Sequence, residues 1–288
     1  MNQLSMDRQV QVIAALVEGN SIRSVERMAG IHRDTIMRLM VRIGQGCDQL
    51  LDGMMRGLTC PRLQLDEIWA YVGMKQRTAK LQNKTDEFGD FYTFVAIDAD
   101  TKLVPAFHIG KRDWDSTEIF IRDLRERIVN RPQISSDSFR AYFGAIQEIF
   151  GHDVDYAQQH KVFASELNTG RGRYSPPKLV KCVNEQSIGN PAPQHVSTAY
   201  VERQNLTMRM GMRRFTRLTN GFSKKRENLV AAVCLHFAHY NFCRIHKSLK
   251  TTPAVIHGLD TRVWSIEELI DAANFAAKQP EQDVANSN

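Results

Sequence analysis

Apolar side chains recur at the spacing of amphipathic helices between residues 7 and 45. Gly19 ends the first apolar stripe, Ser21 is of the type that caps a following helix, and Gly30 lies in a short turn before a third stripe. Two short helices around a glycine turn are typical of a helix-turn-helix, so we predict a DNA-binding domain over residues 1–46. The alternative is a plain three-helix packing unit with solvated arginines. The side chains expected to face the DNA major groove are Arg33, Thr35 and Arg38.

The pattern changes after this segment. Residues 47–60 contain several glycines and show no clear period, so we expect a linker there. After Pro61 the chain is rich in β-branched and aromatic residues, which favour strands. The turn formed by Asp98-Ala99-Asp100 predicts a hairpin between the second and third strands. The three strands are expected at residues 63–74, 91–97 and 103–109.

Helical and strand patterns then alternate along the chain. An amphipathic helix is expected after residue 115, a short strand at residues 134–136 ends at Asp137, and a second amphipathic helix follows it. Residues 154–157 are a further strand candidate. This order of elements predicts a mixed α/β sheet domain with flanking helices, which we place at residues 61–257.

For the rest of the chain, the content of glycine, proline and polar residues predicts where loops and helices lie. Residues 165–197 are rich in glycine and proline and are expected to form a long loop, of a kind that is usually functional. Helices are expected again at residues 198–210 and 223–242. Residues 258–288 end in polar side chains and are expected to form a frayed C-terminal tail.

Composition narrows the class of partner. The 288 residues carry a net charge of +6 with an isoelectric point of about 9.1, which fits a polyanion such as nucleic acid. No secretory signal and no apolar run of membrane-spanning length is evident, so we expect no membrane partner and a cytoplasmic, nucleoid-associated bacterial protein. The five cysteines form no CxxC pair and fit free thiols in a reducing compartment rather than a zinc site.

Three acidic residues occur where acids are costly to bury. Asp66 lies inside an apolar strand, Asp137 follows a short strand, and Glu202 lies in a helix that is otherwise largely apolar. Acids at strand ends and on one helix can converge across the edge of a sheet. Three carboxylates suit Mg²⁺ or Mn²⁺ rather than zinc, and two such ions promote phosphodiester cleavage and joining. The alternative for any single acid is an ordinary salt bridge or helix cap.

Basic residues follow Glu202 closely. Arg209 lies nearly two helical turns after Glu202, so the two side chains are expected to share a face, where the cation would hold a phosphate. A basic block with no acid is usually a solvated surface, but here it favours a phosphate track. Arg244, His246 and Lys247 are further candidates, either for DNA contact or for bracing the active site. The block consists of Arg203, Arg209, Arg213, Arg214, Arg217, Lys224, Lys225 and Arg226.

Other ionisable residues have simpler explanations. Asp98 fits a hairpin turn better than a metal role. Glu67 follows Asp66 on the same strand, so it is expected to point the opposite way and to form a local salt bridge. His236 and His239 share a helix face without a third ligand, which favours a structural pair.

Five segments, in the same order, resemble the catalytic domain of bacterial DDE transposases of the insertion-sequence-one type. The resemblance covers roughly residues 63–254 and implies an RNase H-like fold. The last segment also resembles the end of the wider integrase catalytic core. The segments are LQLDEIWAYVG, ISSDSFRAY, STAYVERQNLTMRM, RRFTRLTNGFSKK and HYNFCRIHKSLKTTPA.

The resemblance also implies a site and a reaction. Asp66, Asp137 and Glu202 take the positions of the DDE triad that binds two divalent ions, and Arg209 takes the basic position that follows. The implied reaction is hydrolysis at a transposon end, which frees a 3′-hydroxyl that attacks target DNA. The chain departs from many relatives in lacking a cysteine-rich zinc element before the helix-turn-helix, and Ser138 stands where glycine is usual.

The sequence therefore predicts an active transposase, with transposon-end and target duplex DNA as partners, no small-molecule cofactor, and a homodimer or larger assembly that holds two ends. One alternative is a catalytically silent DNA-binding regulator derived from a transposase. An intact triad disfavours it. A second alternative is another RNase H-like nuclease, acting on RNA–DNA hybrids or Holliday junctions. The N-terminal helices and the basic block favour work on duplex DNA instead.

Overall fold

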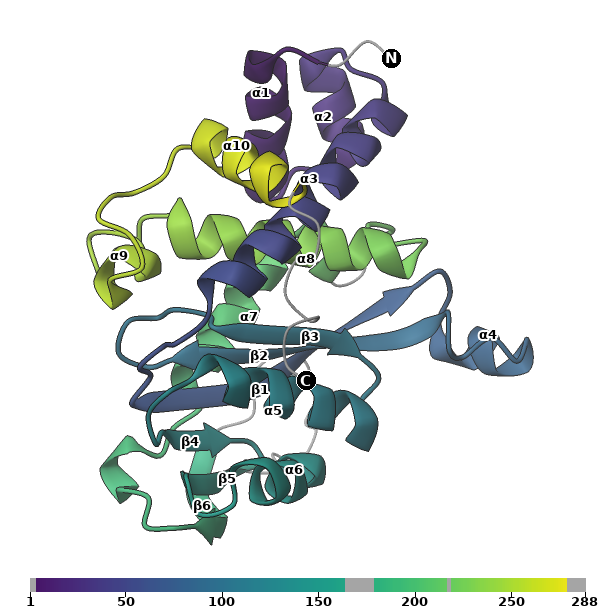
Figure 1. Ribbon diagram of the computed structural model, residues 1–288. Coiled ribbons are helices and arrows are strands. Elements are labelled where there is room, and N and C mark those ends of the chain that lie inside the picture. Colours follow the sequence, from purple (N-terminus) through teal and green to yellow (C-terminus); the bar gives the residue numbers. More distant parts are fainter. Residues whose placement is uncertain (1–3, 164–178, 217–218, 279–288) are drawn as a thin grey trace, which may run out of the picture.

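A mixed sheet forms the centre of the molecule (Figure 1). The computed structural model describes residues 4–163, 179–216 and 219–278. Within them the sheet has six strands in the order β3-β2-β1-β4-β5-β6. The strands are β1 (Arg62–Val72), β2 (Gly89–Asp98), β3 (Ala106–Gly110), β4 (Gln133–Ser136), β5 (Asp155–Phe163) and β6 (Leu179–Ile188).

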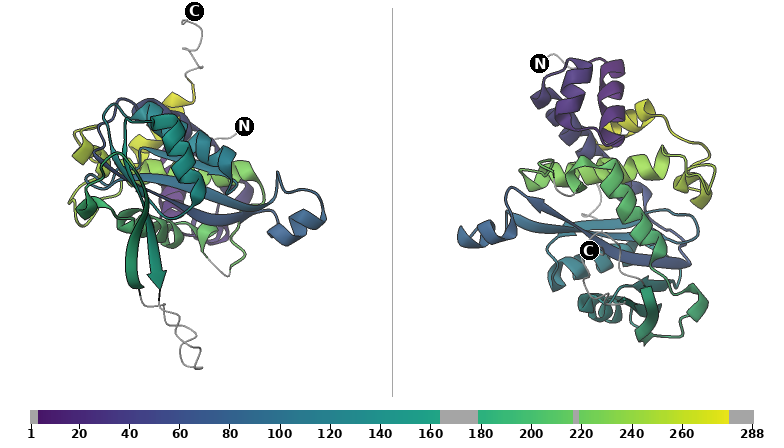
Figure 2. Two further views of the ribbon diagram at one scale, coloured as in Figure 1. Left: turned by 90° about the horizontal axis from the view of Figure 1, so that it is seen from below. Right: turned by 180° about the vertical axis from the view of Figure 1, so that it is seen from behind.

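The strand directions divide the sheet into an antiparallel and a parallel part. The first three strands pair antiparallel in chain order, which confirms the expected hairpin. β4 returns parallel to β1 and β5 parallel to β4, while β6 pairs antiparallel with β5. The β5–β6 pair projects from the rest of the molecule (Figure 2). The mixed α/β prediction is confirmed, and the sheet is compatible with an RNase H-like fold.

Helices cover both faces of the sheet. This is expected because successive side chains of β2 point to opposite faces and most of them are buried. Phe94 packs on Phe120 of α5 (Trp114–Arg127), with ring centroids 5.8 Å apart. On the opposite face, Phe107 of β3 packs on Phe237 of α8 (Arg226–Phe242) at 4.7 Å. α6 (Arg140–Phe150) packs beside α5, and α7 (Ala199–Gly211) packs against β1.

Further helices lie at the two chain ends and in short connections. α1, α2 and α3 gather above the sheet, and α10 lies beside them (Figure 1). α4 sits at the far end of the β1–β2 pair (Figure 2). None of the described helices has the length and apolar character needed to cross a membrane. The bounds are α1 Met6–Val17, α2 Ile22–Ala29, α3 Arg33–Met54, α4 Gln76–Leu81, η1 Pro193–His195, η2 Arg213–Phe215, α9 Pro253–His257 and α10 Ile266–Ala276.

Three segments differ from the sequence-based expectation. The linker expected at residues 47–60 is wrong in its first part, because α3 continues to Met54 and buries Cys47 and Leu51. The tail expected at residues 258–288 is not frayed throughout, because α10 buries Leu269, Ile270 and Ala273 against α3 and its neighbours. The loop expected at residues 165–197 contains β6, although its residues 165–178 lie outside the described part. The division into domains itself stays a prediction.

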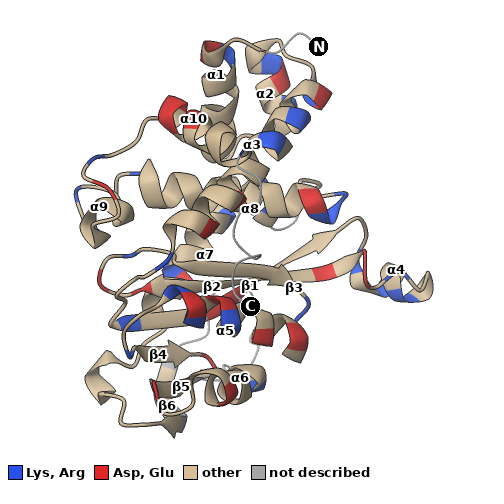
Figure 3. Ribbon diagram, viewed as in Figure 1, with Lys and Arg blue, Asp and Glu red and all other residues tan. Residues whose placement is uncertain are grey.

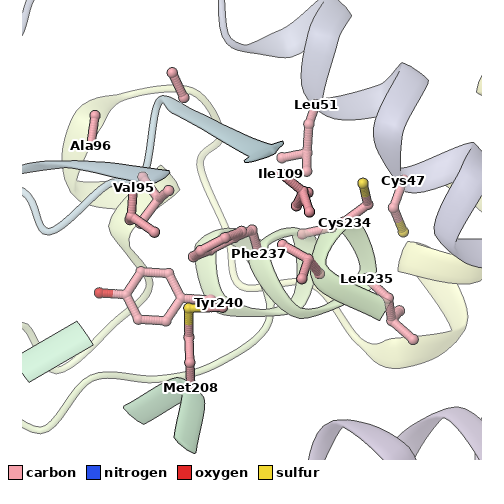
Figure 4. Packing of buried hydrophobic residues seen from close by; sticks show 14 of the residues in the cluster. Cys47, Leu51, Val95, Ala96, Ile109, Met208, Cys234, Leu235, Phe237 and Tyr240 are labelled. Carbon is pink, nitrogen blue, oxygen red and sulfur yellow. The ribbon is translucent and has the colours of Figure 1, made fainter. Parts of the chain in front are cut away.

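Helix α8 connects the sheet to the N-terminal helices. Its side chains from Ala231 to Phe242 are all buried, so it is apolar on every side, as a central helix must be. Figure 4 shows Phe237 facing the strands and Cys234 facing Leu51 of α3. Three polar residues, His236, His239 and Asn241, are buried along with the apolar ones, and the Asn241 amide exchanges two hydrogen bonds, of 3.0 and 3.1 Å, with the backbone of Val104. This pairing satisfies an otherwise costly buried amide.

Two glycines allow α3 to approach its neighbours at backbone distance. A Cβ on Gly44 would clash with the backbone of Ala231 in α8, and one on Gly46 would clash with the backbone of Ala273 in α10. Gly46 therefore marks a helix contact, although the linker was expected to begin at the next residue. Gly53, on the same helix, is exposed and has open space around it.

We predict opposite effects for alanine at these positions. Gly44→Ala should lower the free energy of unfolding by about 2 kcal/mol, because the two helices must separate. Gly53→Ala should raise it by about 0.5–1 kcal/mol, because alanine has the higher helix propensity. Urea denaturation of both variants measures this. Equal effects of the two substitutions would contradict the close contact of α3 with α8.

Candidate metal centre

Strand register brings two of the predicted acids together. β1 and β4 run parallel, with Leu65 paired to Ser136. The next residue on each strand is an aspartate, Asp66 on β1 and Asp137 after β4. The backbone of Phe139 donates a 3.0 Å hydrogen bond to Asp137 Oδ1, which fixes this carboxylate in the turn before α6. The juxtaposition of Asp66 and Asp137 thus follows from the pairing of two short strands.

Glu67 adds a third carboxylate that the sequence did not assign to the site. Oxygen atoms of Asp66, Glu67 and Asp137 all lie within 4.8 Å of one another. The salt bridge expected for Glu67 is present, since Arg112 Nε donates to Glu67 Oε1 at 2.6 Å, and Tyr142 of α6 donates to Oε2 at 3.0 Å. Glu67 therefore faces α6 while Asp66 faces α7. Alternation on the strand does not remove Glu67 from the cluster, because Asp137 lies close to both.

Helix α7 contributes an amide that the sequence analysis missed. Asn205 Nδ2 donates to Asp66 Oδ2 at 2.8 Å. Its Oδ1 atom is buried and has no hydrogen-bond partner among the described residues. Gln64, two residues before Asp66 and on the same face of β1, accepts hydrogen bonds from the backbone of Tyr200 and Val201 at the start of α7. The helix is thus anchored to the strand that carries Asp66. The one sequence feature that could have pointed to Asn205 is its spacing, three residues after Glu202, which places both residues on a similar side of the predicted helix.

Glu202 is not part of this cluster. It pairs with Lys161 of β5 and accepts a 2.6 Å hydrogen bond from Thr198 Oγ1. Its side chain is 46% exposed, so it is the most accessible of the three acids predicted for the triad. The structure therefore brings Asp66 and Asp137 together and leaves Glu202 one helical turn from Asn205, held by a lysine.

Electrostatics make the cluster a poor environment for three negative charges. Burial, together with the charges of Glu67 and Asp137, raises the pKa of Asp66 from 3.8 to about 7. Burial and the charge of Asp137 also raise the pKa of Glu67. A cation placed among these oxygens would compensate the negative charge that burial disfavours. It would also reduce the repulsion among the three carboxylates.

The donor chemistry fits a hard divalent ion. Carboxylate oxygens and an amide oxygen are the ligands that Mg²⁺ and Mn²⁺ prefer, and no sulfur or imidazole atom joins this group among the described residues. The unpartnered Oδ1 of Asn205 is a further oxygen donor next to Asp66. The residues present therefore fit the metal that the sequence predicts.

The predicted DNA-contact residues differ in their surroundings. Arg214 is not a free surface cation, because its guanidinium lies against Met40 of α3, with Nη2 3.1 Å from the sulfur. His246 packs edge-on against Tyr240, with ring centroids 4.6 Å apart, and is only partly exposed. Thr35 and Arg209 are also partly exposed, and Arg217 lies outside the described residues. The exposed members are Arg33, Arg38, Arg203, Arg213, Lys224, Lys225 and Arg244.

The residues for which the sequence favoured a simpler explanation than metal binding have structural roles. Asp98 is fully buried and accepts hydrogen bonds from Thr101 Oγ1 at 2.6 Å and from the Thr101 backbone, which confirms its turn role. Its carboxylate also lies within 4.8 Å of the ligand atoms of Cys60 and His257. Burial lowers the pKa of His236 to about 3 and that of His239 to about 4, consistent with neutral core histidines.

The chain has a remote structural similarity to a known protein. No family model and no curated protein matches it. Among solved structures, it is similar to the cryo-EM structure of a piggyBac transposase synaptic complex with hairpin DNA, at 9% sequence identity and a TM-score of 0.39, covering 96% of this chain and 73% of that chain. A TM-score at this level supports no conclusion about function.

We predict that Asp66→Asn stabilises the metal-free protein at alkaline pH. The pKa of Asp66 is higher in the folded state, so the stability linked to this group is present below about pH 4 and is lost as the pH rises through about 7. The variant removes this loss, which is on the order of a few kcal/mol. Its new amide can donate to the unpartnered Oδ1 of Asn205 once that amide turns over.

Thermal denaturation in a chelator at pH 5 and pH 8 tests this. The melting temperature of Asp66→Asn, relative to the parent, should rise between the two pH values. Glu148→Gln, which removes a charge on the exposed face of α6, serves as the control and should show no such rise. A pH-independent difference for Asp66→Asn would show that burial and the neighbouring carboxylates do not raise the pKa of Asp66.

Proposed function

We propose that the chain is a DDE transposase of the insertion-sequence-one type, which cleaves transposon ends and joins them to target DNA. The observation that carries the proposal is the convergence of Asp66 and Asp137 from adjacent parallel strands into an all-oxygen cluster. The five sequence segments that resemble this family include both residues and Glu202. The cluster gives these segments a chemical reason to occur together.

The proposed site binds two Mg²⁺ or Mn²⁺ ions through Asp66, Asp137 and Glu202. When bound, such ions polarise the scissile phosphate and activate the attacking oxygen. Glu202 can join only after it leaves Lys161, whose ammonium then becomes available to a phosphate oxygen. Asn205 orients Asp66, and Arg112 with Tyr142 holds Glu67 in place. We assign phosphate binding beside the site to Arg209.

The proposed reaction has two steps at phosphorus. Water attacks the phosphodiester at the transposon end, the bond to the 3′-oxygen breaks, and that oxygen takes up a proton to become a 3′-hydroxyl. The hydroxyl then attacks a target phosphodiester, forms the new strand joint, and releases a 3′-hydroxyl of the target. Phosphoryl transfer of this kind depends mainly on positioning and charge stabilisation, and no protein nucleophile is needed.

DNA recognition is assigned to the N-terminal helices. In this proposal α3 reads duplex DNA with Arg33, Thr35 and Arg38, all near its N-terminal end. Gly30 adopts the left-handed conformation in the turn between α2 and α3, as the sequence pattern requires. Two DNA ends must be held together during transposition, so we further propose a homodimer or larger assembly.

We predict that the triad substitutions separate binding from cleavage. Asp137→Asn and Glu202→Gln should each lower metal-dependent cleavage and strand transfer by about 100-fold or more, because each removes a metal ligand. DNA binding should persist in both variants. The assay uses purified protein, Mg²⁺ or Mn²⁺, and duplexes carrying the ends of the element that encodes the chain.

Glu67→Gln is the informative comparison. Glu67 lies in the cluster but is held by Arg112 and Tyr142, so this variant should retain more activity than Glu202→Gln. The reverse order would make Glu67 the third catalytic acid. A parent protein that binds the ends and never cleaves them would instead support the silent DNA-binding regulator.

A second prediction concerns the Lys161–Glu202 pair. If Glu202 is a metal ligand, Lys161→Met should raise the affinity for Mn²⁺ without DNA by about two- to fivefold, because breaking a partly exposed ion pair changes the free energy by at most about 1 kcal/mol. Electron paramagnetic resonance of Mn²⁺ titrations measures this. Lys181→Met removes the same charge from the neighbouring strand as a control. Combining Lys161→Met with Glu202→Gln should abolish the gain, and a gain that survives would exclude Glu202 as a ligand.

A further inference from the structure

A large cleft separates the N-terminal helices from the start of α8. It has a volume of about 1010 Å³. One wall comes from residues 16–40 and the other from residues 211–236. The cleft thus lies where two segments far apart in the sequence meet, and its lining does not include the acid cluster.

The lining of the cleft is strongly basic. Six cations and a single acid, Asp34, line it. Figure 3 shows basic residues both on α3 and at the N-terminal end of α8. The cations come from both walls, so the positive charge is a property of the assembled cleft. They are Arg23, Arg33, Arg213, Arg214, Lys224 and Lys225.

Arg214 has no acidic partner among the described residues. Its guanidinium lies 3.1 Å from the sulfur of Met40 and 3.3 Å from the hydroxyl of Ser223. Burial lowers the pKa of Arg214 to about 10. A guanidinium placed against thioethers loses hydration without gaining a counter-charge, and such an arrangement is costly in the isolated protein.

Arg127 shows how the same chain pairs a buried arginine. Its side chain is 10% exposed, and Nη2 lies 2.8 Å from carboxylate oxygens of both Asp52 and Asp123. Arg214 has only sulfur and hydroxyl contacts in the corresponding role. Arg214 also lines the cleft, so an anion bound there could supply the counter-charge that the described residues do not.

The shape and charge of the cleft fit a polyanion. Phosphate oxygens match the fork of an arginine guanidinium, and cations on both walls can contact successive phosphates. The position of the cleft between α3 and α8 links the predicted DNA-reading helix to the helix that packs on the central sheet.

We propose that this cleft binds the phosphodiester backbone of duplex DNA, with Arg214 as the anchor at its wall. Binding there fixes the N-terminal helices relative to α7 and α8 and so sets the distance between the recognised sequence and the acid cluster. The choice of DNA as the anion rests on the proposed function. The presence of an anion site rests on the unpaired guanidinium and the basic lining alone.

Arg214→Met tests the proposal with little risk to the fold. Methionine keeps the contacts with Met37 and Met40 and removes an unpaired charge, so the melting temperature should be equal to or higher than that of the parent. Affinity for a fluorescent duplex should fall by about tenfold. The slope of log affinity against log salt concentration should decrease in magnitude by about one. Arg122→Met, on the exposed face of α5, is the matched control and should change neither the affinity for DNA nor the salt slope.

Arg23→Met examines the opposite wall, because Arg23 lines the cleft and has no part in the proposed DNA reading by α3. If one backbone occupies the cleft, Arg23→Met should also weaken binding. Unchanged affinity and salt slope in Arg214→Met would overturn the proposal. Stabilisation of the parent by inorganic phosphate that Arg214→Met abolishes, with DNA binding intact, would assign the site to a small anion and overturn the DNA assignment.

The outcome is separable from that of the proposed function. Binding assays without divalent ions report on the cleft alone, whereas cleavage assays report on the acid cluster. A protein that binds DNA through Arg214 and never cleaves it keeps the cleft and refutes the transposase. If the parent cleaves DNA and Arg214→Met binds DNA with an unchanged salt dependence, the transposase proposal stands and the cleft proposal is refuted.

Discussion

The burial of α8 on all sides is the constraint on which the arrangement of the molecule depends. A helix that is apolar all round must be covered all round, and here the sheet covers one side and α3 the other. The contact with α3 reaches backbone distance at Gly44. Because α3 also carries the N-terminal helices, packing α8 fixes where those helices lie relative to the central sheet. The basic cleft is a consequence of this packing, since its two walls meet only in the folded chain.

The acid cluster follows from a second, more local constraint. Parallel pairing of β1 with β4 aligns two aspartates, and α7 is anchored to β1 through Gln64. Each anchor is a backbone or amide interaction that operates whatever the charge state of the site. The fold therefore supplies the energy that holds carboxylates against their own repulsion. The raised pKa of Asp66 reflects that cost.

Period and residue type predicted the first five strands and the Asp66–Asp137 pair, because alternation and strand ends are visible in one dimension, whereas β6 was expected to be loop. The end of α3 was misplaced because a glycine that permits a helix contact, such as Gly46, looks the same in sequence as one beside a linker. Asn205 and Glu67 were missed or set aside because their roles depend on which face meets α7 or α6. Arg214 was expected in a phosphate track along the basic block, and only the folded chain shows it against two methionines.

The two unusual sites carry opposite uncompensated charges. The acid cluster holds three carboxylates of which only Glu67 is paired with an arginine, and the cleft holds a guanidinium with no carboxylate. The chain could have paired these charges with each other, as it does at Arg127, and it does not. Each site therefore carries charge that a ligand of opposite sign would compensate. Under the proposed function, a metal-bound nucleic acid would supply both ligands at once, because its cations would match the cluster and its phosphates the cleft. This complementarity is the physical argument that connects the proposed function with the proposed cleft.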